Sequence, residues 1–389
     1  MSFSWPTIVT LLSLAWSLTV SLADGADRDC RAERFGDLPP EVTFNPTIQC
    51  PIVPEKDWGM IGSLAFTADG KALAARSGGK TRFYDPEATI TLDDTPKLKT
   101  FQDAGFPVTF APDGRVMAGG ANYGVALIDA ATGRRVRQLK VAPEVLRLGL
   151  LTLAFSPDGK LLVGGFYSGE VVVWEVATGR QAYVLPPFVI PAGKIGRFGR
   201  EIGARPARMT GLAFSPDGAT LYTAGGILRA WNVATGQERF RFDKPLNGFM
   251  SCVTVSPDGT VVAAGDEGNI RLTTGERDER NTLTLWDAAT GRKWSEMPTC
   301  RSIEGVAFLP GGRQLVSLEA HGVICLWDVA AAKRLAAVRF DGHLYAVCMA
   351  LSPDGKRIAI GGQGSNWIFG VIQLIDTDGV TLTPRLAKP

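Results

Sequence analysis

The sequence predicts an all-β protein built from seven copies of one unit. A strand-like segment that ends in a glycine turn recurs, as LAFTADG, VTFAPDG, LAFSPDG (twice), VTVSPDG, VAFLPGG and MALSPDG, ending at Gly70, Gly114, Gly159, Gly218, Gly259, Gly312 and Gly355. An aromatic or β-branched segment follows each copy, as TRFYD, VALID, VVVWE, LRAWN, LTLWD, ICLWD and IQLID. Repeats of about 20 to 50 residues are typical of stacked architectures, in which each unit buries its faces against its neighbours.

Each unit reads as three clear strands and a weaker fourth. In SPDG, Pro sets φ near the value of the first turn corner and Asp-Gly tolerates positive φ, so the segment predicts a tight connection between antiparallel strands. ATGR at residues 177–180 and 289–292 predicts a second turn of the same kind. β-branched and aromatic residues fill the segments between turns, as half-buried strands require. QAYVL at residues 181–185 is an example of the weaker fourth strand.

These motifs resemble the WD40 repeat, which forms one blade of a β-propeller. The resemblance covers residues 61–385 and implies a seven-bladed propeller with four-stranded blades arranged around a central axis. It says little about activity, because one fold supports many functions.

The chain departs from the family in its polar residues. WD40 blades often contain a hydrogen-bonded set of His, Asp, Ser or Thr, and Trp, but the one Gly-His pair, Gly342-His343, occurs in a blade with Ile375 at the Trp position. The blades that have the Trp carry other residues at the His position: Arg147, Pro206, Asn247 and Cys300. We therefore expect apolar packing, not a repeated hydrogen-bond network, to hold the blades. The buried structural tryptophans are then Trp174, Trp231, Trp286 and Trp327.

Residues 1–23 are expected to be a signal peptide. Residues 7–23 form an apolar run that ends in small residues, with Ser21 and Ala23 at the positions that a signal peptidase prefers. The run has no Lys or Arg at its start, and a retained membrane anchor is the alternative. We then expect an N-terminal extension over residues 24–60, a propeller over residues 61–389, and a periplasmic or secreted protein of bacterial type. Which terminus completes the last blade is left open.

Export determines how the cysteines are interpreted. Cys30 and Cys50 lie in a Pro-rich stretch, where a disulfide would order the chain in an oxidising compartment. Cys252 and Cys348 occupy equivalent positions in blades five and seven and are expected to be buried free thiols. Cys300 and Cys325 both fall near a tryptophan in the family's geometry, and their pairing is left open. The absence of any Cys-x-x-Cys argues against a covalent haem, a thioredoxin-like centre and a zinc finger.

Composition and the innermost strands argue against several function classes. The formal net charge of +2 is too small to direct the whole surface toward nucleic acid. There is no nucleophile elbow and no phosphate-binding loop. We expect neither a metal nor a cofactor, because the inner-strand positions that could line the central channel hold only Ala or Thr: Ala65, Thr109, Ala154, Ala213, Thr254, Ala307 and Ala350.

Three insertions fall on one face of the predicted propeller. Residues 186–209 carry five bases and one acid, residues 266–281 carry five acids and three bases, and residues 363–370 are Gly-rich and aromatic. Loops that a rigid scaffold displays on one side often carry function, and Arg, Trp and Phe are typical interface anchors. The candidate binding residues are Lys194, Arg197, Phe198, Arg200, Arg205, Arg208, Arg271, Arg277, Trp367 and Phe369.

The sequence favours an exported, non-catalytic WD40 scaffold that binds a protein partner through this face, with a glycan as a second candidate. Contact with a membrane is expected only if the N-terminal segment is retained. The alternative function is a propeller enzyme or cofactor-binding protein, resembling lactonases or quinoproteins. The alternative arrangement of the insertions is that the acidic one pairs with the basic one while the aromatic side chains pack inward.

Overall fold

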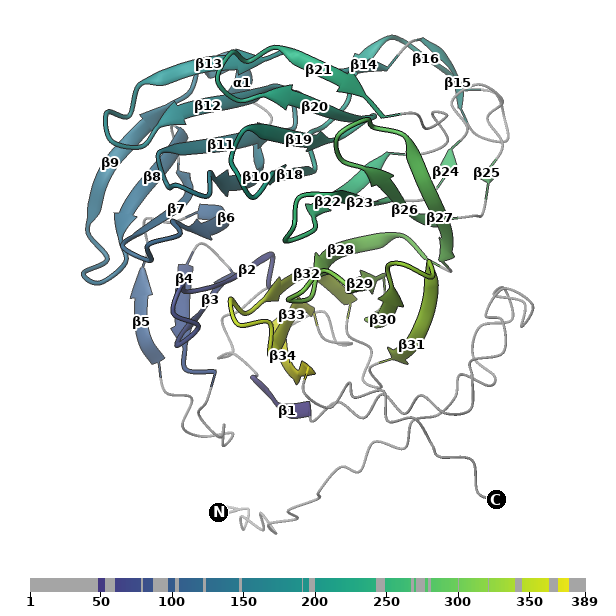
Figure 1. Ribbon diagram of the computed structural model, residues 1–389. Helices are drawn as coiled ribbons and strands as arrows, with labels where there is room; N and C mark the ends of the chain where they lie inside the picture. Colours follow the sequence, from purple (N-terminus) through teal and green to yellow (C-terminus); the bar gives the residue numbers. More distant parts are fainter. Residues whose placement is uncertain are drawn as a thin grey trace, which may run out of the picture.

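The computed structural model describes residues 48–52, 60–77, 80–86, 97–101, 105–121, 124–146, 149–190, 192–195, 200–242, 249–266, 269–270, 277–278, 281–299, 301–320, 322–339, 345–363 and 370–377. Seven four-stranded antiparallel sheets stand around a common centre (Figure 1). The predicted seven-bladed all-β fold is therefore confirmed.

The first three blades follow the expected order, in which the innermost strand comes first and the outermost strand last. They are β2 (Ser63–Phe66), β3 (Leu73–Ser77), β4 (Lys80–Tyr84) and β5 (Lys97–Phe101); β6 (Gly105–Phe110), β7 (Val116–Ala121), β8 (Gly124–Asp129) and β9 (Arg135–Lys140); and β10 (Leu150–Phe155), β11 (Leu161–Phe166), β12 (Val171–Glu175) and β13 (Gln181–Leu185). One short helix, α1 (Pro143–Leu146), connects the second blade to the third.

Blades four to six repeat this order. They are β18 (Gly211–Phe214), β19 (Thr220–Ala224), β20 (Leu228–Asn232) and β21 (Glu238–Arg241); β22 (Met250–Val255), β23 (Val261–Asp266), β26 (Asn281–Asp287) and β27 (Lys293–Thr299); and β28 (Ile303–Phe308), β29 (Gln314–Glu319), β30 (Val323–Asp328) and β31 (Lys333–Arg339). Apolar clusters run from each blade into the next, so the core is a ring of interfaces between blades.

The seventh blade joins the two ends of the chain. Its inner strands are β32 (Tyr345–Leu351), β33 (Arg357–Gln363) and β34 (Gly370–Asp376), and its outer strand is β1 (Ile48–Ile52). The N-terminal segment therefore completes the last blade, which the sequence left open. β1 lies within the stretch that the sequence placed before the propeller. A backbone bond from Ile61 N to Gly362 O, 3.1 Å long, also joins the first blade to the last.

The N-terminal 47 residues, with the expected signal peptide and Cys30, lie outside the described part of the chain. No helix within the described ranges is long and apolar enough to cross a lipid bilayer.

The turns that follow the innermost strands contact one another around the ring. Their glycines have φ between 69° and 74°, which only glycine adopts easily. Each glycine faces the Pro of the preceding blade, so that a Cβ on Gly159 would lie 3.6 Å from Cδ of Pro112, and one on Gly218 would lie 3.5 Å from Cδ of Pro157. Gly70 faces Pro353 and closes the ring, while Ala68 replaces the Pro opposite Gly114. A side chain at these glycines would therefore disturb the contact between two blades.

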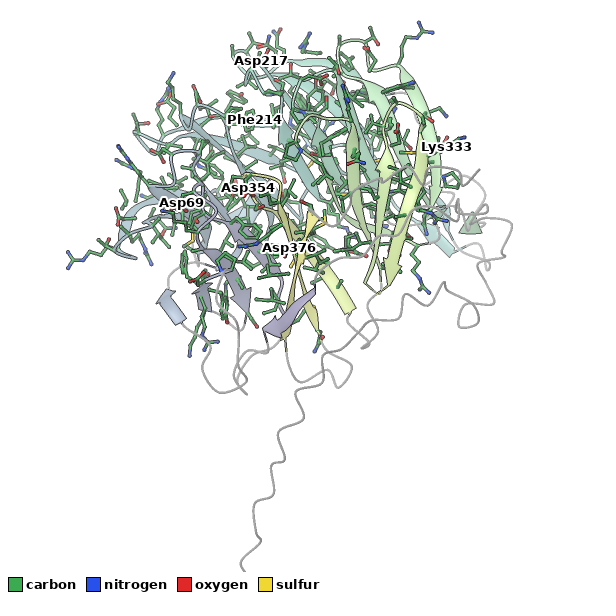
Figure 2. All side chains as sticks on the ribbon, turned by 60° about the horizontal axis from the view of Figure 1, so that its bottom comes forward. Asp69, Phe214, Asp217, Lys333, Asp354 and Asp376 are labelled. Atoms are coloured by element: carbon green, nitrogen blue, oxygen red, sulfur yellow. The ribbon has the colours of Figure 1, made fainter. Side chains whose placement is uncertain are left out.

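A hydrogen-bonded Ser-Asp pair recurs inside these turns. Ser156 Oγ donates to Asp158 Oδ1 (2.7 Å), which also accepts from Lys160 N (3.1 Å), while Leu161 N donates to Ser156 Oγ (2.9 Å). These donors lower the pKa of Asp158 to about 2. The same pair occurs as Thr67 and Asp69, Ser215 and Asp217, Ser256 and Asp258, and Ser352 and Asp354; Figure 2 labels three of these aspartates.

The sequence predicted no repeated network around the tryptophans; the network that does repeat is local to each turn. The indoles themselves differ from blade to blade. Trp231 donates to Thr223 Oγ1 (3.0 Å), Trp327 donates to Ser317 Oγ (2.9 Å), and Trp174 donates to the backbone oxygen of Lys140 (3.2 Å). The indole nitrogen of Trp286 is buried and has no acceptor among the described residues. All four rings are at most 3% exposed.

Three cysteines in the described ranges are free thiols: Cys252, Cys325 and Cys348. Burial raises the pKa of Cys252 and of Cys348 to about 12, so both behave as inert apolar groups. The thiol of Cys325 donates to Glu319 Oε1 at 3.3 Å, so the pairing with Cys300 that the sequence left open does not form. Cys50 lies on β1, and Cys30, its predicted disulfide partner, lies outside the described residues.

Candidate functional site

The three insertions lie on the face opposite the Ser-Asp turns. Residues 186–209 follow β13, residues 266–281 follow β23, and residues 363–370 follow β33, which are the fourth or second strands of their blades. Antiparallel strands reverse direction at each turn, so connections after second and fourth strands leave the same side of the ring. We call this side the insertion face.

The basic insertion is a β-hairpin. β14 (Val189–Ile190) pairs with β17 (Arg205–Pro206), and further out β15 (Gly193–Ile195) pairs with β16 (Arg200–Ile202). Lys194 is opposite Glu201 in this register. Figure 1 shows the hairpin beside the fourth blade, extending beyond the ring. The basic residues are therefore carried on paired strands, which hold their backbone in a defined position.

The base of this basic hairpin is packed between blades three and four. The ring of Phe188 is half-buried and lies against Gly226, where a Cβ would be 2.5 Å from Cδ1 of the ring. Ala207 N donates to Phe188 O (2.8 Å), and Ala207 is 1% exposed. Gly169 has a φ of 90° and leaves room for the carbonyl of Ala207. Phe188 therefore packs inward, as the alternative arrangement of the insertions expected for the aromatic side chains.

A buried arginine fixes the start of the basic hairpin. The Arg229 side chain on β20 is 3% exposed, and its Nη2 donates to the backbone oxygen of Pro186 at 2.9 Å. Its Nη1 lies 3.5 Å from Glu238 Oε2, and the guanidinium stacks 4.5 Å from the centre of the Trp231 ring. Burial lowers the pKa of Arg229, while the Glu238 carboxylate opposes this shift. The arginine thus connects the hairpin to the packed core of blade four.

Sequence reasoning missed Arg229, although a signal was present. In the aligned third strands, Arg229 occupies the position of Val172, Thr284 and Cys325. A charged residue in a buried strand is rarely tolerated without partners, so its presence indicates a specific contact.

The acidic insertion is also a hairpin, formed by β24 (Asn269–Ile270) and β25 (Arg277–Asp278). Its first acid does not face the solvent. Asp266 is 1% exposed and accepts hydrogen bonds from Thr282 N (3.0 Å) and Thr282 Oγ1 (2.8 Å). The carboxylate therefore joins the two strands at the base of the hairpin, and the surface charge of this insertion is less negative than the sequence count suggests.

Comparisons with known proteins agree with the repeat geometry. The family described as WD domain, G-beta repeat, matches residues 147–175 and 240–273. Telomerase protein component 1 of Rattus norvegicus is 24% identical over 295 residues, which are 66% of this chain and 10% of that protein. Apoptotic protease-activating factor 1 of Rattus norvegicus is 37% identical over 106 residues, or 27% of this chain and 8% of that protein. Periodic tryptophan protein 2 of Arabidopsis thaliana is 26% identical over 232 residues, or 57% of this chain and 22% of that protein.

The chain is a WD40 β-propeller. Seven four-stranded blades and two matches to the repeat family support this assignment together. The chain spans about a tenth of telomerase protein component 1 and about a fifth of periodic tryptophan protein 2, so the similarity concerns the propeller alone.

Only some of the predicted binding residues lie in the part of the WD40 propeller that the structure describes. Arg205 is exposed on β17, and Arg208 is half-buried where the hairpin enters blade four. Strands β15, β16 and β25 contain Lys194, Arg200 and Arg277. The other predicted residues lie outside the described ranges: Arg197, Phe198, Arg271, Trp367 and Phe369.

The insertion face of the WD40 propeller also exposes apolar side chains that sequence reasoning missed. Met60 and Phe106, at the start of the innermost strands of blades one and two, are 45% and 44% exposed, and the Phe106 ring lies against Gly62. Tyr167, after β11, is 46% exposed, and Val189 on β14 is 53% exposed. The sequence does not distinguish these four side chains from core residues, because apolar residues occur in the same strands at both buried and exposed positions.

The innermost strands hold the seven Ala and Thr residues at half-buried positions. Within the described ranges, no group of three or more His, Cys, Asp or Glu side chains is placed to bind a metal ion.

Proposed function

We propose that this WD40 propeller is a non-catalytic scaffold that binds a protein partner on its insertion face, chiefly through the basic hairpin. The observation that carries the proposal is the anchoring of that hairpin by buried Arg229 and by the packed base around Phe188 and Ala207. A rigid support lowers the conformational entropy lost when a partner binds.

Charge and exposure indicate the kind of partner. The basic hairpin favours an acidic surface, and the exposed Tyr167 and Val189 on the same face offer apolar contact next to it. The Ala and Thr residues of the inner strands favour binding over catalysis. One relative, telomerase protein component 1, is by its name a part of a larger assembly, which is compatible with a scaffold. A glycan remains the second class of ligand to test.

The first prediction concerns the two bases on the hairpin strands. Crosslinking and pull-down first identify a partner. The double variant Arg200→Glu, Arg205→Glu should then weaken binding of that partner about tenfold or more. It should also flatten the dependence of affinity on salt, because charges on a surface act through screened attraction. Arg229→Met should also weaken binding, since it keeps the surface charges but releases the hairpin. Trp367→Ala should speed dissociation, as loss of a buried anchor does.

The matched control is Arg292→Ser, in an ATGR turn on the opposite face, which should leave affinity unchanged. Surface plasmon resonance at low and high salt gives both rate constants. An affinity that falls with Arg292→Ser but not with the hairpin variants would show that the partner binds the other face.

We also propose that residues 1–23 direct export to a periplasm or beyond and are removed, and that Cys30 and Cys50 form a disulfide afterwards. The apolar run with its small-residue end supports this proposal. Intact-mass measurement of the exported protein should give a chain that begins after Ala23. Peptide mapping without reduction should show Cys30 joined to Cys50, and two freely alkylated thiols would contradict the disulfide.

A further inference from the structure

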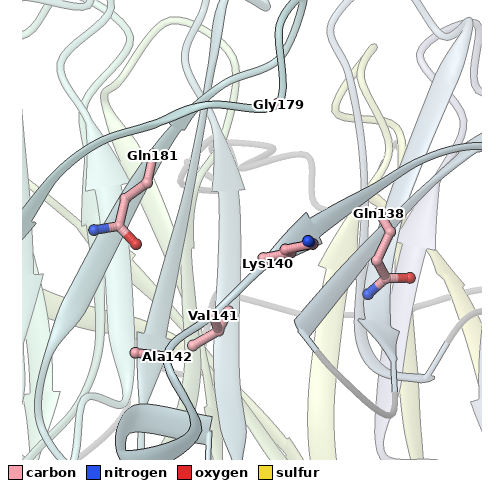
Figure 3. Close-up of a pocket in the computed structure, with 6 residues that line it drawn as sticks. All are labelled: Gln138, Lys140, Val141, Ala142, Gly179 and Gln181. Atoms are coloured by element: carbon pink, nitrogen blue, oxygen red, sulfur yellow. The ribbon is translucent and has the colours of Figure 1, made fainter.

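A groove lies on the rim of the propeller between the outer strands of blades two and three. It encloses about 430 Å³ and is lined by Gln138, Lys140, Val141, Ala142, Gly179 and Gln181. Figure 3 shows Gln181 on one side and Gln138 on the other, with Lys140 between them and Val141 and Ala142 below. The groove lies along the rim, and none of its lining residues belongs to the three insertions.

Contacts between the two blades fix the shape of the groove. Arg137 on β9 donates to the backbone oxygens of Thr178 (2.9 Å) and Ala177 (3.0 Å) in the ATGR turn of blade three. The indole of Trp174 donates to Lys140 O at 3.2 Å, next to the groove. These bonds tie β9 to blade three, so the two sides of the groove cannot move apart without breaking them.

One edge of β9 has no strand beside it among the strands that the structure describes. β9 is the last strand of the order β6-β7-β8-β9, and the carbonyl of Leu139 points toward Gly124 on β8. Successive residues of a strand direct their backbone groups to opposite sides, so those of Gln138 and Lys140 face the groove. Lys140 O already accepts the indole of Trp174, which leaves the amides of Gln138 and Lys140 and the carbonyl of Gln138 for a strand that is added there.

The charge along this edge is one-sided. Residues 130–142 contain four bases and no acid: Arg134, Arg135, Arg137 and Lys140. Arg134 and Lys140 are exposed, and the bonds of Arg137 to neutral carbonyls leave its charge in place. Across the groove, Glu175 forms an ion pair with Arg180 and so adds no net negative charge. The outer strand on the other side of the groove, β13, has no ionised group.

The groove also contains a hydrogen-bond donor that lacks a partner. Nε2 of Gln138 is buried and has no acceptor among the described residues. Burying an amide without an acceptor is unfavourable, so a ligand that brings an acceptor to this nitrogen gains affinity.

We propose that this groove binds an extended acidic segment of a partner protein as an added strand on the free edge of β9. The backbone of the segment would pair with Gln138 and Lys140, and its carboxylates would face the basic residues of the strand. Pairing of main chains provides affinity in such additions, while side-chain charge selects the sequence. The proposal does not rest on the proposed function, because the two surfaces share no residue.

A fluorescein-labelled peptide, Glu-Val-Glu-Val-Glu-Val-Glu, tests the proposal by fluorescence polarisation. Lys140→Glu reverses the charge at the groove, and Ala142→Trp fills its mouth without changing any charge. Each should weaken binding about tenfold, which corresponds to ~1.4 kcal/mol. Lys333→Glu, at the start of outer strand β31 in blade six, changes the net charge by the same amount as Lys140→Glu and should leave affinity within about twofold, since a distant exposed charge is screened. Figure 2 labels Lys333.

Two further measurements decide the mode of binding. Hydrogen exchange should slow at the amides of Gln138 and Lys140 when the peptide binds, and a peptide with Lys in place of Glu should not bind. Equal losses with Lys140→Glu and Lys333→Glu would show general attraction to a basic surface and overturn the proposal. A loss with Arg205→Glu but not with Ala142→Trp would place the peptide on the insertion face, which overturns this inference while leaving the proposed function intact.

Discussion

Replacing Trp174 by alanine should lower the free energy of unfolding by about 3–5 kcal/mol, the usual result of emptying a buried aromatic site. The ring is fully buried between blades two and three and meets Phe166 edge-on at 6.5 Å between centroids. Its indole also donates to Lys140 O, so the variant leaves that carbonyl without its partner. Chemical denaturation followed by fluorescence of the remaining tryptophans measures the change.

Trp294→Ala is the matched control, because this tryptophan on β27 is 49% exposed. Its loss should change stability by no more than about 0.5 kcal/mol, as for most surface substitutions. If Trp174→Ala left stability unchanged but abolished binding of a partner, the ring would be part of a binding surface and the structural interpretation would be wrong.

Deleting residues 1–59 should destabilise the propeller strongly, whereas deleting residues 1–47 should not. The longer deletion removes β1, which pairs Ile48 with Ile375 and Ile52 with Ile372. Both partners on β34 are fully buried, as is most of Leu374. Since a buried Ile or Leu contributes about 1.5–3 kcal/mol, their partial exposure should cost on the order of 3 kcal/mol.

The longer deletion should also associate with itself, because an uncovered strand edge pairs with other chains. Thermal unfolding and size-exclusion chromatography of the two truncated proteins measure both effects. Equal stability and a monomeric elution for the two deletions would show that β1 does not contribute to closing the ring.

The repeats could be predicted from the sequence because the information is local. Pro and Asp-Gly determine each turn within a few residues, and the strands between them alternate as half-buried strands do. The insertion face followed from counting strands, since every turn reverses the chain. The Ser-Asp pairs are local as well, since Ser156 and Asp158 are two residues apart, but the serine was not recognised as the donor to the aspartate.

The candidate site was predicted only in part. The composition of residues 186–209 identified a basic insertion, but its pairing as a hairpin depends on register between residues that alternate weakly. The inward packing of Phe188 depends on the space at Gly226, in another blade. The counted acid Asp266 proved to be a buried acceptor for Thr282, which no charge count distinguishes from a surface carboxylate.

The sequence by itself determined the number of blades, the turn chemistry and the face that carries the insertions, since each is specified within one repeat. Only the tertiary structure decided that β1 completes the seventh blade, that Arg229 anchors the hairpin, and that β9 and β13 enclose a basic groove. These features are contacts between segments far apart in the chain, as between Ile48 and Ile375, and between neighbouring blades. Such contacts depend on how the blades pack around the ring, which the pattern within one repeat does not encode.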